Sequence, residues 1–486
     1  MTDRHADDAF LRARHTVSDW SGPTRIETDS LGPAEIPADA YWGINVRRAL
    51  DNFPISGRPI SIYPDLIFGY ACVKQAAARA NAEIGVLDRQ RADAIDRACE
   101  EIKQGKLRDQ FVVDIIQGGA GTSTNMNVNE VIANRALELS GHAKGEYEHI
   151  DPNDHVNRSQ STNDSYPTAL KIGLCLSIER LIDELERLSG AFRDKGRDFA
   201  GVLKVGRTQL QDAVPMTLQQ EFEAFAITLA DDLVSFDLLT TQLWEVNLGA
   251  TAVGTGIAAD PRYADAVRVH LAAITGYDIV TAPDLIEATT DVAVFMDLSS
   301  TLKRSAMKLS KICNDLRLLA SGPQAGFGEI ALPPRQAGSS IMPGKVNPVI
   351  PEVVNEVAFV VAGADVTVSM AAEAGQLQLN AFGPVMTHVL FESLQWMTAA
   401  MATLRVNCVT GIDANREHLA AQTGSFVGVI TSLIPHIGYA AATKLAKEAL
   451  TTHANIADLV VSAGLMSRDQ VNSLLTPEKL TRTQAE

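Results

Sequence analysis

The sequence is poor in cysteine, and its cysteines are far apart. Five occur in 486 residues and no two form a C-x-x-C pair. An odd, scattered set argues against a disulfide framework and favours free, buried thiols in a reducing compartment. We therefore expect a cytoplasmic protein. The five are Cys72, Cys99, Cys175, Cys313 and Cys408.

Long apolar runs are also missing. Residues 1–22 are charged throughout and lack the apolar core of a signal peptide. Residues 418–443 contain no Asp, Glu, Lys or Arg, but Gly424, Pro435 and Gly438 divide them into short pieces. A membrane-spanning helix needs about 20 consecutive apolar residues. We expect this stretch to form a buried helix–turn–helix and expect no association with a membrane.

Basic residues are in deficit. Lys and Arg number 42 against 59 Asp and Glu, which gives a net charge of −17 with His neutral. A surface of this sign repels a phosphate backbone, and no basic cluster offsets it, so the composition argues against nucleic acid as a partner. If the substrate is an anion, its site must supply donors locally.

The length and the pattern of residues predict three domains. Apolar residues make up 46% and charged residues 21% of the chain, which is ordinary for a globular protein. We expect a mostly helical N-terminal domain at 1–159, in which 1–22 form a flexible arm and 23–60 include short β-capable pieces. A central domain follows at 160–411, and a small C-terminal domain of shorter helices at 412–486.

The central domain is dominated by very long helical patterns. We expect helices from Pro215 to about Gly249, from Asp291 to about Ala320, after Pro351 towards Gly375, and after Pro384 to about Cys408. Helices average about eleven or twelve residues, so several of twice that length predict a mainly all-α protein with a central long-helix bundle. Their wide apolar stripes need partners on more than one side, which favours oligomerisation.

Four loop-like segments collect small polar residues and glycine: 117–130, 152–167, 206–215 and 338–352. The glycines of the first allow backbone amides to approach a ligand, and Thr122 adds a hydroxyl. The second places Ser161, Thr162 and Asn163 just before a helical pattern. These three residues are either simple helix caps or donors to a carboxylate at the positive end of that helix.

The segment 338–352 carries the most information. Its Gly338-Ser339-Ser340 start is polar and flexible, as expected of a lid. Lys345 and Asn347 follow between Pro343 and Pro348, and a lysine held between two prolines can bind a carboxylate. The alternative is a surface loop of chance composition.

Three stretches together resemble the signature regions of the fumarase/aspartase superfamily, whose members release fumarate by elimination. They read GSSIMPGKVNP at 338–348, QGGAGTSTNMNVNEVIANRALELSG at 117–141 and NDHVNRSQSTNDSYPTA at 153–169. The resemblance runs from about Thr24 into the C-terminal domain. It implies the three-domain superfamily fold, whose long helices assemble into a tetrameric multi-helix core.

Local residues resemble the branch of the superfamily that acts on L-aspartate. Fumarases typically have His in GRTHLQDA, where this chain has Gln209, and a glutamine cannot relay a proton as an imidazole does. PVIPEVVNEV and MAAEAGQLQLNAFGPV also resemble that branch, as does YWGINVRRALDNF, which places Arg48 on the substrate side. The implied reaction is reversible conversion of L-aspartate to fumarate and ammonia.

The resemblance assigns a role to each site residue. Ser339 is the general base that removes the C3 proton, and the resulting aci-carboxylate dianion needs strong electrostatic stabilisation. Lys345 and Asn347 bind a carboxylate, and Asn163, Thr208 and Gln209 surround the α-carboxylate or ammonium side. The residues matched to stabilisation of the dianion are Thr122, Ser161, Thr162 and Ser340.

The resemblance also implies the partners. Each active site is shared by three subunits of a homotetramer, and the substrate is a small molecule. No cofactor or metal is required, and whether divalent cations activate the enzyme stays open.

Other functions fit the sequence less well. A class II fumarase is the main alternative, because it shares the carboxylate-binding residues. Lyases of larger substrates, such as argininosuccinate, differ in their loops. Ala320-Ser321-Gly322 is the tripeptide of aromatic ammonia-lyases, but it lacks their flanking residues, and GTGIAA at 254–259 is a weak dinucleotide match. A structural, non-enzymatic member would have lost site residues that are present here.

Overall fold

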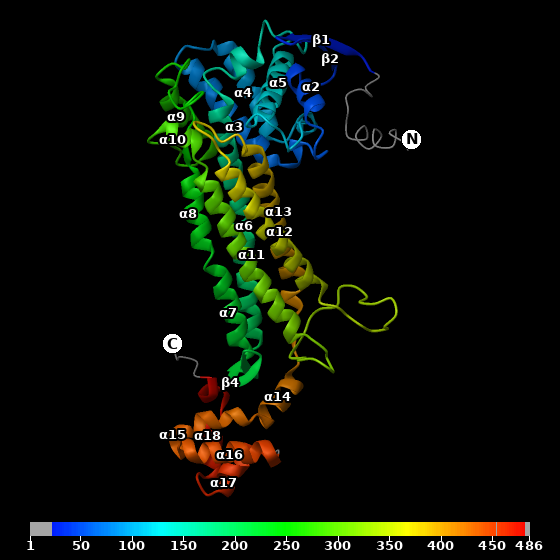
Figure 1. Cartoon of the computed structure of the whole chain (residues 1–486), viewed down its shortest axis with the longest axis vertical. Coiled ribbons are helices and arrows are strands. Elements are labelled where there is room, and N and C mark those ends of the chain that lie inside the picture. The colour runs from blue at the N-terminus through cyan, green and yellow to red at the C-terminus, as the bar shows by residue number, and fades with distance from the viewer. Residues whose placement is uncertain (1–21, 453, 482–486) are drawn as a thin grey trace. The chain divides into compact units, whose positions relative to one another are not determined.

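The computed structural model describes residues 22–452 and 454–481 (Figure 1). The contacts within the chain group it into two compact units. The first unit comes from Met1–Leu181, Val234–Lys303 and Val360–Trp396, and the second from Ile182–Leu233, Arg304–Phe359 and Met397–Glu486. The expected flexible arm lies outside the described residues except for Gly22. The three domain boundaries given by the sequence stay a prediction.

The prediction of a mainly helical protein is confirmed, since the described strands form only two-stranded sheets. Four helices of 25 residues or more contribute residues to both units. They are α6 (Thr162–Asp198), α11 (Ala293–Leu319), α12 (Val349–Glu373) and α13 (Gly383–Asn407). The last three were expected within a few residues of these bounds, whereas the 37-residue length of α6 was not foreseen.

The core of the first unit is built around α3 (Pro64–Glu83), which contacts α4, α5 and α9. Most of α3 is buried, and its many alanines allow neighbouring helices to approach closely. Pro64 occupies the first turn, where a missing N–H is harmless. The expected β-capable pieces form the antiparallel pair β1 and β2. The elements of this unit are β1 (Thr24–Asp29), β2 (Gly32–Pro37), α2 (Ile44–Asn52), η2 (Ile60–Ile62), α3, α4 (Arg89–Lys103), η3 (Arg108–Gln110), α5 (Thr122–Leu139), η4 (Pro152–Val156), α8 (Leu233–Leu243), β5 (Glu245–Val246), α9 (Tyr263–Thr275), β6 (Val280–Thr281) and α10 (Leu285–Thr290).

The second unit contains a β-hairpin and a series of short helices with their own apolar core. Leu433, Leu445, Val460 and Val471 lie in that core, and the expected helix–turn–helix at 418–443 is divided among several short helices. The elements are β3 (Leu203–Thr208), β4 (Gln211–Thr217), α7 (Leu218–Ala230), β7 (Ile330–Ala331), η5 (Val409–Gly411), β8 (Asp413–Ala414), α14 (Arg416–Ser425), η6 (Val427–Leu433), α15 (Ile434–Ile437), α16 (Tyr439–Thr452), α17 (Ile456–Ser462), α18 (Arg468–Leu474) and α19 (Pro477–Thr481).

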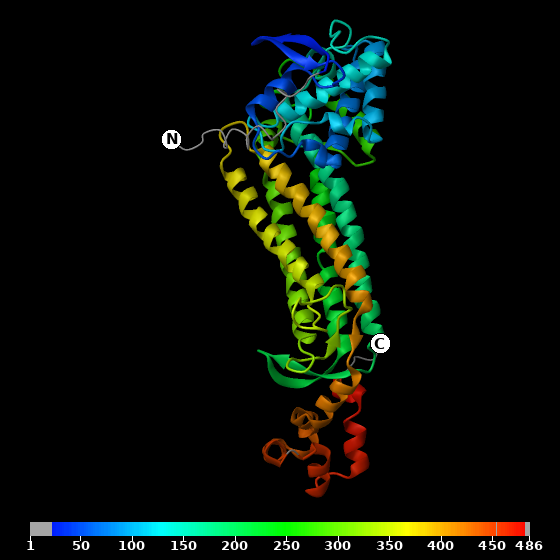
Figure 2. The ribbon, with the colours of Figure 1, turned by 90° about the vertical axis from the view of Figure 1, so that its right-hand side faces the viewer.

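The expected helix from Pro215 to Gly249 is wrong in two respects. Pro215 belongs to strand β4, which pairs with β3, so the segment expected as a loop at 206–215 is mostly a hairpin (green strands in Figure 2). The helix begins only at Leu218, where the Thr217 side chain forms a capping box with Gln220. It then breaks at Asp231-Asp232. The buried Asp232 carboxylate forms ion pairs with Arg304 and Lys308. These pairs compensate a buried charge at a position where a continuous helix would place an apolar residue.

Helix α12 has an unusual composition. Among the described residues it alone is long and apolar enough to cross a membrane by length and composition, a test that core helices also pass. Phe359, Val366 and Met370 are 63%, 58% and 68% exposed. With 3.6 residues per turn these three side chains share one face of the helix. That apolar face needs a cover.

All five cysteines are free and buried, as the sequence predicted. Burial raises the pKa of the thiols of Cys72, Cys175 and Cys408 to about 12. Deprotonation to the reactive thiolate is therefore suppressed.

Candidate active site

The predicted site residues fall into two groups, one in each unit. The first unit holds Arg48, Thr122, Ser161, Thr162 and Asn163. The second holds Thr208, Gln209, Ser339, Ser340, Lys345 and Asn347.

Thr122 is the first residue of α5 and is exposed. Its hydroxyl donates to the carbonyl of Gly119 at 2.8 Å. The turn before it needs glycine at position 121, because that residue has φ = 90° and a Cβ there would lie 2.1 Å from the Tyr166 ring. The glycine-rich segment therefore presents the positive end of α5 next to an exposed hydroxyl, which suits an anionic group.

Ser161 and Asn163 lie at the start of α6. The Ser161 hydroxyl accepts a hydrogen bond from the backbone N–H of Asn163 at 3.1 Å, so the capping role left open by the sequence is present. The Asn163 amide donates to the carbonyl of Ala252 at 2.7 Å. Thr162, between them, is buried. These contacts fix the first turn of α6.

A lysine that the sequence analysis did not single out joins the segment at the start of α5 to the segment before α6. Lys74, on α3, is fully buried and donates to Asn125 Oδ1 (2.7 Å), Asn157 Oδ1 (2.9 Å) and Gln160 Oε1 (3.0 Å). Asn125 is in α5, and the other two precede α6. Burial lowers the pKa of Lys74 to about 7. The sequence feature that could have pointed to Lys74 is a single lysine in the alanine-rich stretch CVKQAAARA at 72–80.

Asp164 is a second buried charge near these segments. Its carboxylate accepts backbone N–H groups of Ser161 (2.9 Å), Thr251 (2.9 Å) and Gly249 (3.2 Å). Burial raises its pKa to about 6, although these donors act in the opposite direction. Asp164 therefore ties the start of α6 to the loop at 249–251.

Arg48 is held by an ion pair in the first unit. Its guanidinium donates to both carboxylate oxygens of Asp29, at 2.8 and 2.9 Å, and to the carbonyl of Gly32 at 2.9 Å. Hydrogen bonding to Arg48 lowers the pKa of Asp29 to about 2. The structure thus places Arg48 at the turn between β1 and β2.

In the second unit, Thr208 and Gln209 lie at the tip of the β3–β4 hairpin. Gln209 and Leu210 form its two-residue turn with φ of 55° and 61°, and all three residues are exposed. Such a turn normally selects Asn or Gly, since left-handed φ costs other residues roughly 1 kcal/mol or more. Strained, exposed tips of this kind are common at functional sites.

The loop at 338–347 is organised around Ser339. The Ser339 hydroxyl oxygen accepts the backbone N–H groups of Ile341 (3.2 Å) and Met342 (3.0 Å). Asn347 donates to the carbonyl of Gly338 at 2.7 Å and closes the base of the loop. Ser340 and Lys345 are exposed, and Ile341 is 84% exposed. The loop thus presents its polar and apolar side chains outward.

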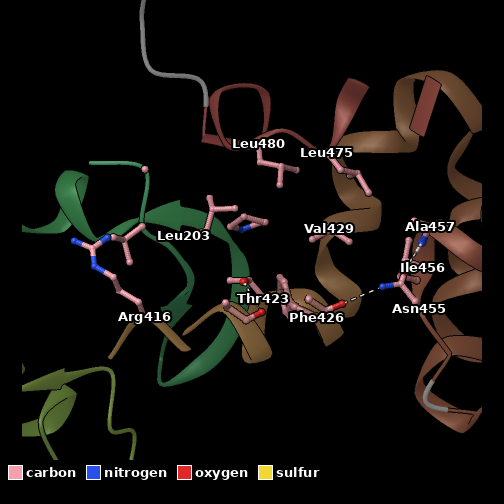
Figure 3. A pocket seen from close by; sticks show the side chains of 15 residues that line it. Leu203, Arg416, Thr423, Phe426, Val429, Asn455, Ile456, Ala457, Leu475 and Leu480 are labelled. Atoms are coloured by element: carbon pink, nitrogen blue, oxygen red, sulfur yellow. Dashed lines mark hydrogen bonds between the residues drawn. The ribbon is translucent and has the colours of Figure 1, made fainter. Parts of the chain in front are cut away.

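A separate cavity of about 460 Å³ lies in the second unit, lined by residues of β3, α14, η6 and α17 (Figure 3). Asn455 donates to the carbonyl of Gly424 across one side of it, at 3.1 Å. Among the described residues that line it, none belongs to the predicted site. It is therefore not the predicted substrate site.

Comparison with known proteins gives matches along almost the whole chain. The family model described as Lyase matches residues 32–363, and the one described as Fumarase C C-terminus matches 429–482. Aspartate ammonia-lyase of Pseudomonas aeruginosa is 54% identical over 94% of this chain and 97% of its own length. Aspartate ammonia-lyase of Escherichia coli is 49% identical over 95% and 96%.

Two solved structures are also similar to this chain over nearly all of its length. The fumarate lyase:delta crystallin from Brucella melitensis bound to cobalt has a TM-score of 0.91 and 50% identity, covering 94% of this chain and 99% of that one. Class II fumarase from Schistosoma mansoni has a TM-score of 0.88 and 30% identity, covering 95% and 100%.

Proposed function

Because the chain belongs to the lyase family of the fumarase/aspartase superfamily, we propose that it is an aspartate ammonia-lyase, which converts L-aspartate reversibly to fumarate and ammonia. The observation that carries the proposal is its similarity, over nearly all its length, to enzymes of that name. Class II fumarase from Schistosoma mansoni is less similar, with 30% sequence identity. Gln209, in place of the fumarase histidine, supports the same choice.

The difficult step is removal of a proton from C3 of aspartate. The carbanion becomes accessible only when the β-carboxylate takes up the charge as an aci-carboxylate dianion, so stabilisation of that dianion is the main task of the site. We assign it to Thr122, Ser161, Thr162 and Ser340. Exposure of Thr122 at the positive end of α5 supports this assignment.

We assign Ser339 as the general base. A serine hydroxyl must be activated to act as a base. The two backbone N–H groups that its oxygen accepts, from Ile341 and Met342, are donors that favour the alkoxide form. Exclusion of water on closure of the loop would strengthen both hydrogen bonds.

The remaining polar residues bind the other end of the substrate. Lys345 and Asn347 hold a carboxylate, and Asn163, Thr208 and Gln209 surround the α-carboxylate or the ammonium group. The amine is already protonated in the substrate, so no strong acid is needed when ammonia leaves. Arg48 lies on the substrate side in this proposal and is oriented by Asp29.

The site is assembled in a homotetramer, with three subunits contributing to each active site. Two observations support this part of the proposal. The site residues of one chain are divided between two units, and α12 presents Phe359, Val366 and Met370 on one uncovered apolar face. Exposed apolar surface of this kind marks contact with a partner.

In this proposal the reaction needs no cofactor or metal, because the assigned hydroxyl groups stabilise the dianion and Lys345 holds the other carboxylate. Divalent-cation activation remains a separate property to measure. We also propose a cytoplasmic location, which the free, buried cysteines support. Its acidic surface disfavours nucleic acid.

The direct test is to follow fumarate by its ultraviolet absorbance with L-aspartate or L-malate as sole substrate. Fumarate should form from L-aspartate with release of ammonia, and at least about a hundredfold more slowly from L-malate (about 2.7 kcal/mol in the barrier). Faster turnover of L-malate would favour the fumarase alternative and refute the proposal.

A further inference from the structure

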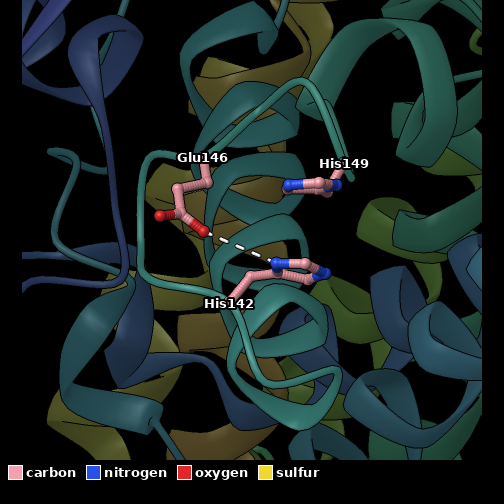
Figure 4. Close-up of side chains that lie close together, drawn as sticks. All are labelled: His142, Glu146 and His149. Carbon is pink, nitrogen blue, oxygen red and sulfur yellow. Dashed lines mark ion pairs between the residues drawn. The ribbon is translucent and has the colours of Figure 1, made fainter.

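We propose that His142, Glu146 and His149 form a binding site for a divalent transition-metal ion such as Zn²⁺. The three residues lie in the loop after α5, in the first unit (Figure 4). Their ligand atoms all lie within 4.8 Å of one another. This site belongs to neither group of predicted active-site residues.

The two imidazole rings are arranged as a pair. They are stacked with centroids 3.8 Å apart and ring planes 15° apart. Figure 4 shows a nitrogen of each ring on the side that faces Glu146. His142 Nδ1 is 3.5 Å from the Glu146 carboxylate. Because the nitrogen lone pairs lie in the ring planes, one of the two rings must turn about its side-chain torsions for both nitrogens to reach the same ion.

The spacing suits a metal ion. Zinc lies about 2.0–2.2 Å from histidine nitrogen and carboxylate oxygen, so two ligand atoms of a tetrahedral site are about 3.4 Å apart. Atoms within 4.8 Å reach that distance through side-chain shifts below about 1 Å. Glu146 and the histidines are exposed or half-buried, so an ion has direct access.

The loop that carries the triad is fixed by its own hydrogen bonds. Glu146 Oε2 accepts the backbone N–H of Ala143 (3.0 Å), and the His149 N–H donates to the carbonyl of Glu146 (3.1 Å). Gly145 N–H donates to Asn134 on α5 (2.8 Å). Lys144, the only other basic residue in the loop, donates to the carbonyl of Asp39 and lies over the Tyr41 ring. A prearranged loop loses little entropy on binding an ion.

The donor set identifies the class of metal. Two imidazoles and one carboxylate suit Zn²⁺, Co²⁺ or Ni²⁺, whereas Mg²⁺ and Ca²⁺ prefer oxygen ligands only. With three protein ligands, further positions are left for water or for a second molecule.

The ion would stabilise the protein rather than take part in the reaction. Thr122 lies at the opposite end of α5, and an 18-residue helix is about 27 Å long. Tyr147, in the same loop, donates to Glu27 on β1 at 3.0 Å. Closing the loop with an ion therefore fastens the end of α5 to the β1–β2 pair.

The test is titration of the metal-free full-length protein with Zn²⁺ by calorimetry, together with thermal unfolding. We expect a Zn²⁺ site that Mg²⁺ does not occupy, and a melting temperature that rises with Zn²⁺ concentration. His149→Ala and the conservative Glu146→Gln should each weaken this site by at least about tenfold. Both side chains are at the surface, and circular dichroism checks that the variants are folded.

His270→Ala is the matched control. His270 pairs with the Glu83 carboxylate at 2.7 Å and, among the described residues, belongs to no cluster of potential metal ligands. This variant should bind Zn²⁺ with wild-type affinity. Unchanged Zn²⁺ affinity in both His149→Ala and Glu146→Gln, or an equal loss in His270→Ala, would overturn the proposal.

Discussion

Two side chains show how single residues prepare the site. Ser339 accepts hydrogen bonds from two backbone N–H groups, so the oxygen that we propose as the base already faces donors. Lys74 has the opposite character, because its ammonium group is buried among three neutral amide oxygens with no carboxylate in hydrogen-bond contact among the described partners. One residue is proposed to act on the substrate, and the other joins α5 to the segment before α6.

Replacing Ser339 by Ala should remove the proton acceptor. General bases contribute about 10²- to 10⁴-fold to rate, so kcat for fumarate formation should fall by that factor while the assembled protein remains folded. Steady-state kinetics and sedimentation check both points. A kcat near that of the wild type would remove Ser339 from its assigned role.

Lys74→Met should change how stability depends on pH. The pKa of Lys74 is lowered from 10.5 to about 7 in the folded protein, so between these values the unfolded chain binds more protons and this residue's contribution to the free energy of unfolding rises with pH. Two pH units correspond to on the order of 2 kcal/mol. The stability difference between wild type and variant, from urea unfolding at pH 7 and pH 9, should therefore grow by about that amount. A difference that does not vary with pH contradicts the assignment.

At the scale of elements, the β3–β4 hairpin is the clearest departure from the sequence-based expectation. Its two turn residues, Gln209 and Leu210, adopt left-handed φ and are exposed. A turn selected for stability alone would have Asn or Gly at these positions.

The two turn residues allow a matched comparison. Gln209→Gly and Leu210→Gly relieve the same backbone strain, but only the first removes an assigned substrate contact. We expect kcat/KM for L-aspartate to fall about tenfold in Gln209→Gly, as for one lost hydrogen bond, and to change little in Leu210→Gly. Equal effects of the two changes would mean that Gln209 does not contact the substrate.

The sequence was informative where periodicity and long motifs act together. Helices α11, α12 and α13 and the β1–β2 pair follow from apolar spacing and turn residues, and GSSIMPGKVNP led to the family that the comparisons confirm. The break at Asp231-Asp232 could not be predicted, because it depends on ion pairs with Arg304 and Lys308, far along the chain. Lys74 was missed for the same reason, since its three partners come from other segments.

For the whole molecule, the division of the site residues between two units carries the main consequence. If every active site takes Thr122 and Ser339 from different subunits, the two residues need not be intact in the same chain. Two inactive variants can then repair each other.

Mixing Thr122→Ala and Ser339→Ala tests this directly. Each variant alone should have little activity. After co-expression or unfolding and joint refolding in equal amounts, about a quarter of the sites in randomly mixed tetramers receive both native residues, and a corresponding share of wild-type activity should return. Activity no higher than the average of the two separate variants would show that each chain builds its own site.

The burial of every native thiol has a practical use. Since none of the five reacts readily, a sixth cysteine placed on the outside would be the only one that a maleimide dye modifies. Val346→Cys, in the loop that carries Ser339, is a suitable position because Val346 is 50% exposed. Fluorescence from that single label would report whether the loop changes its surroundings when L-aspartate or fumarate is added, without removal of any natural sulfur atom.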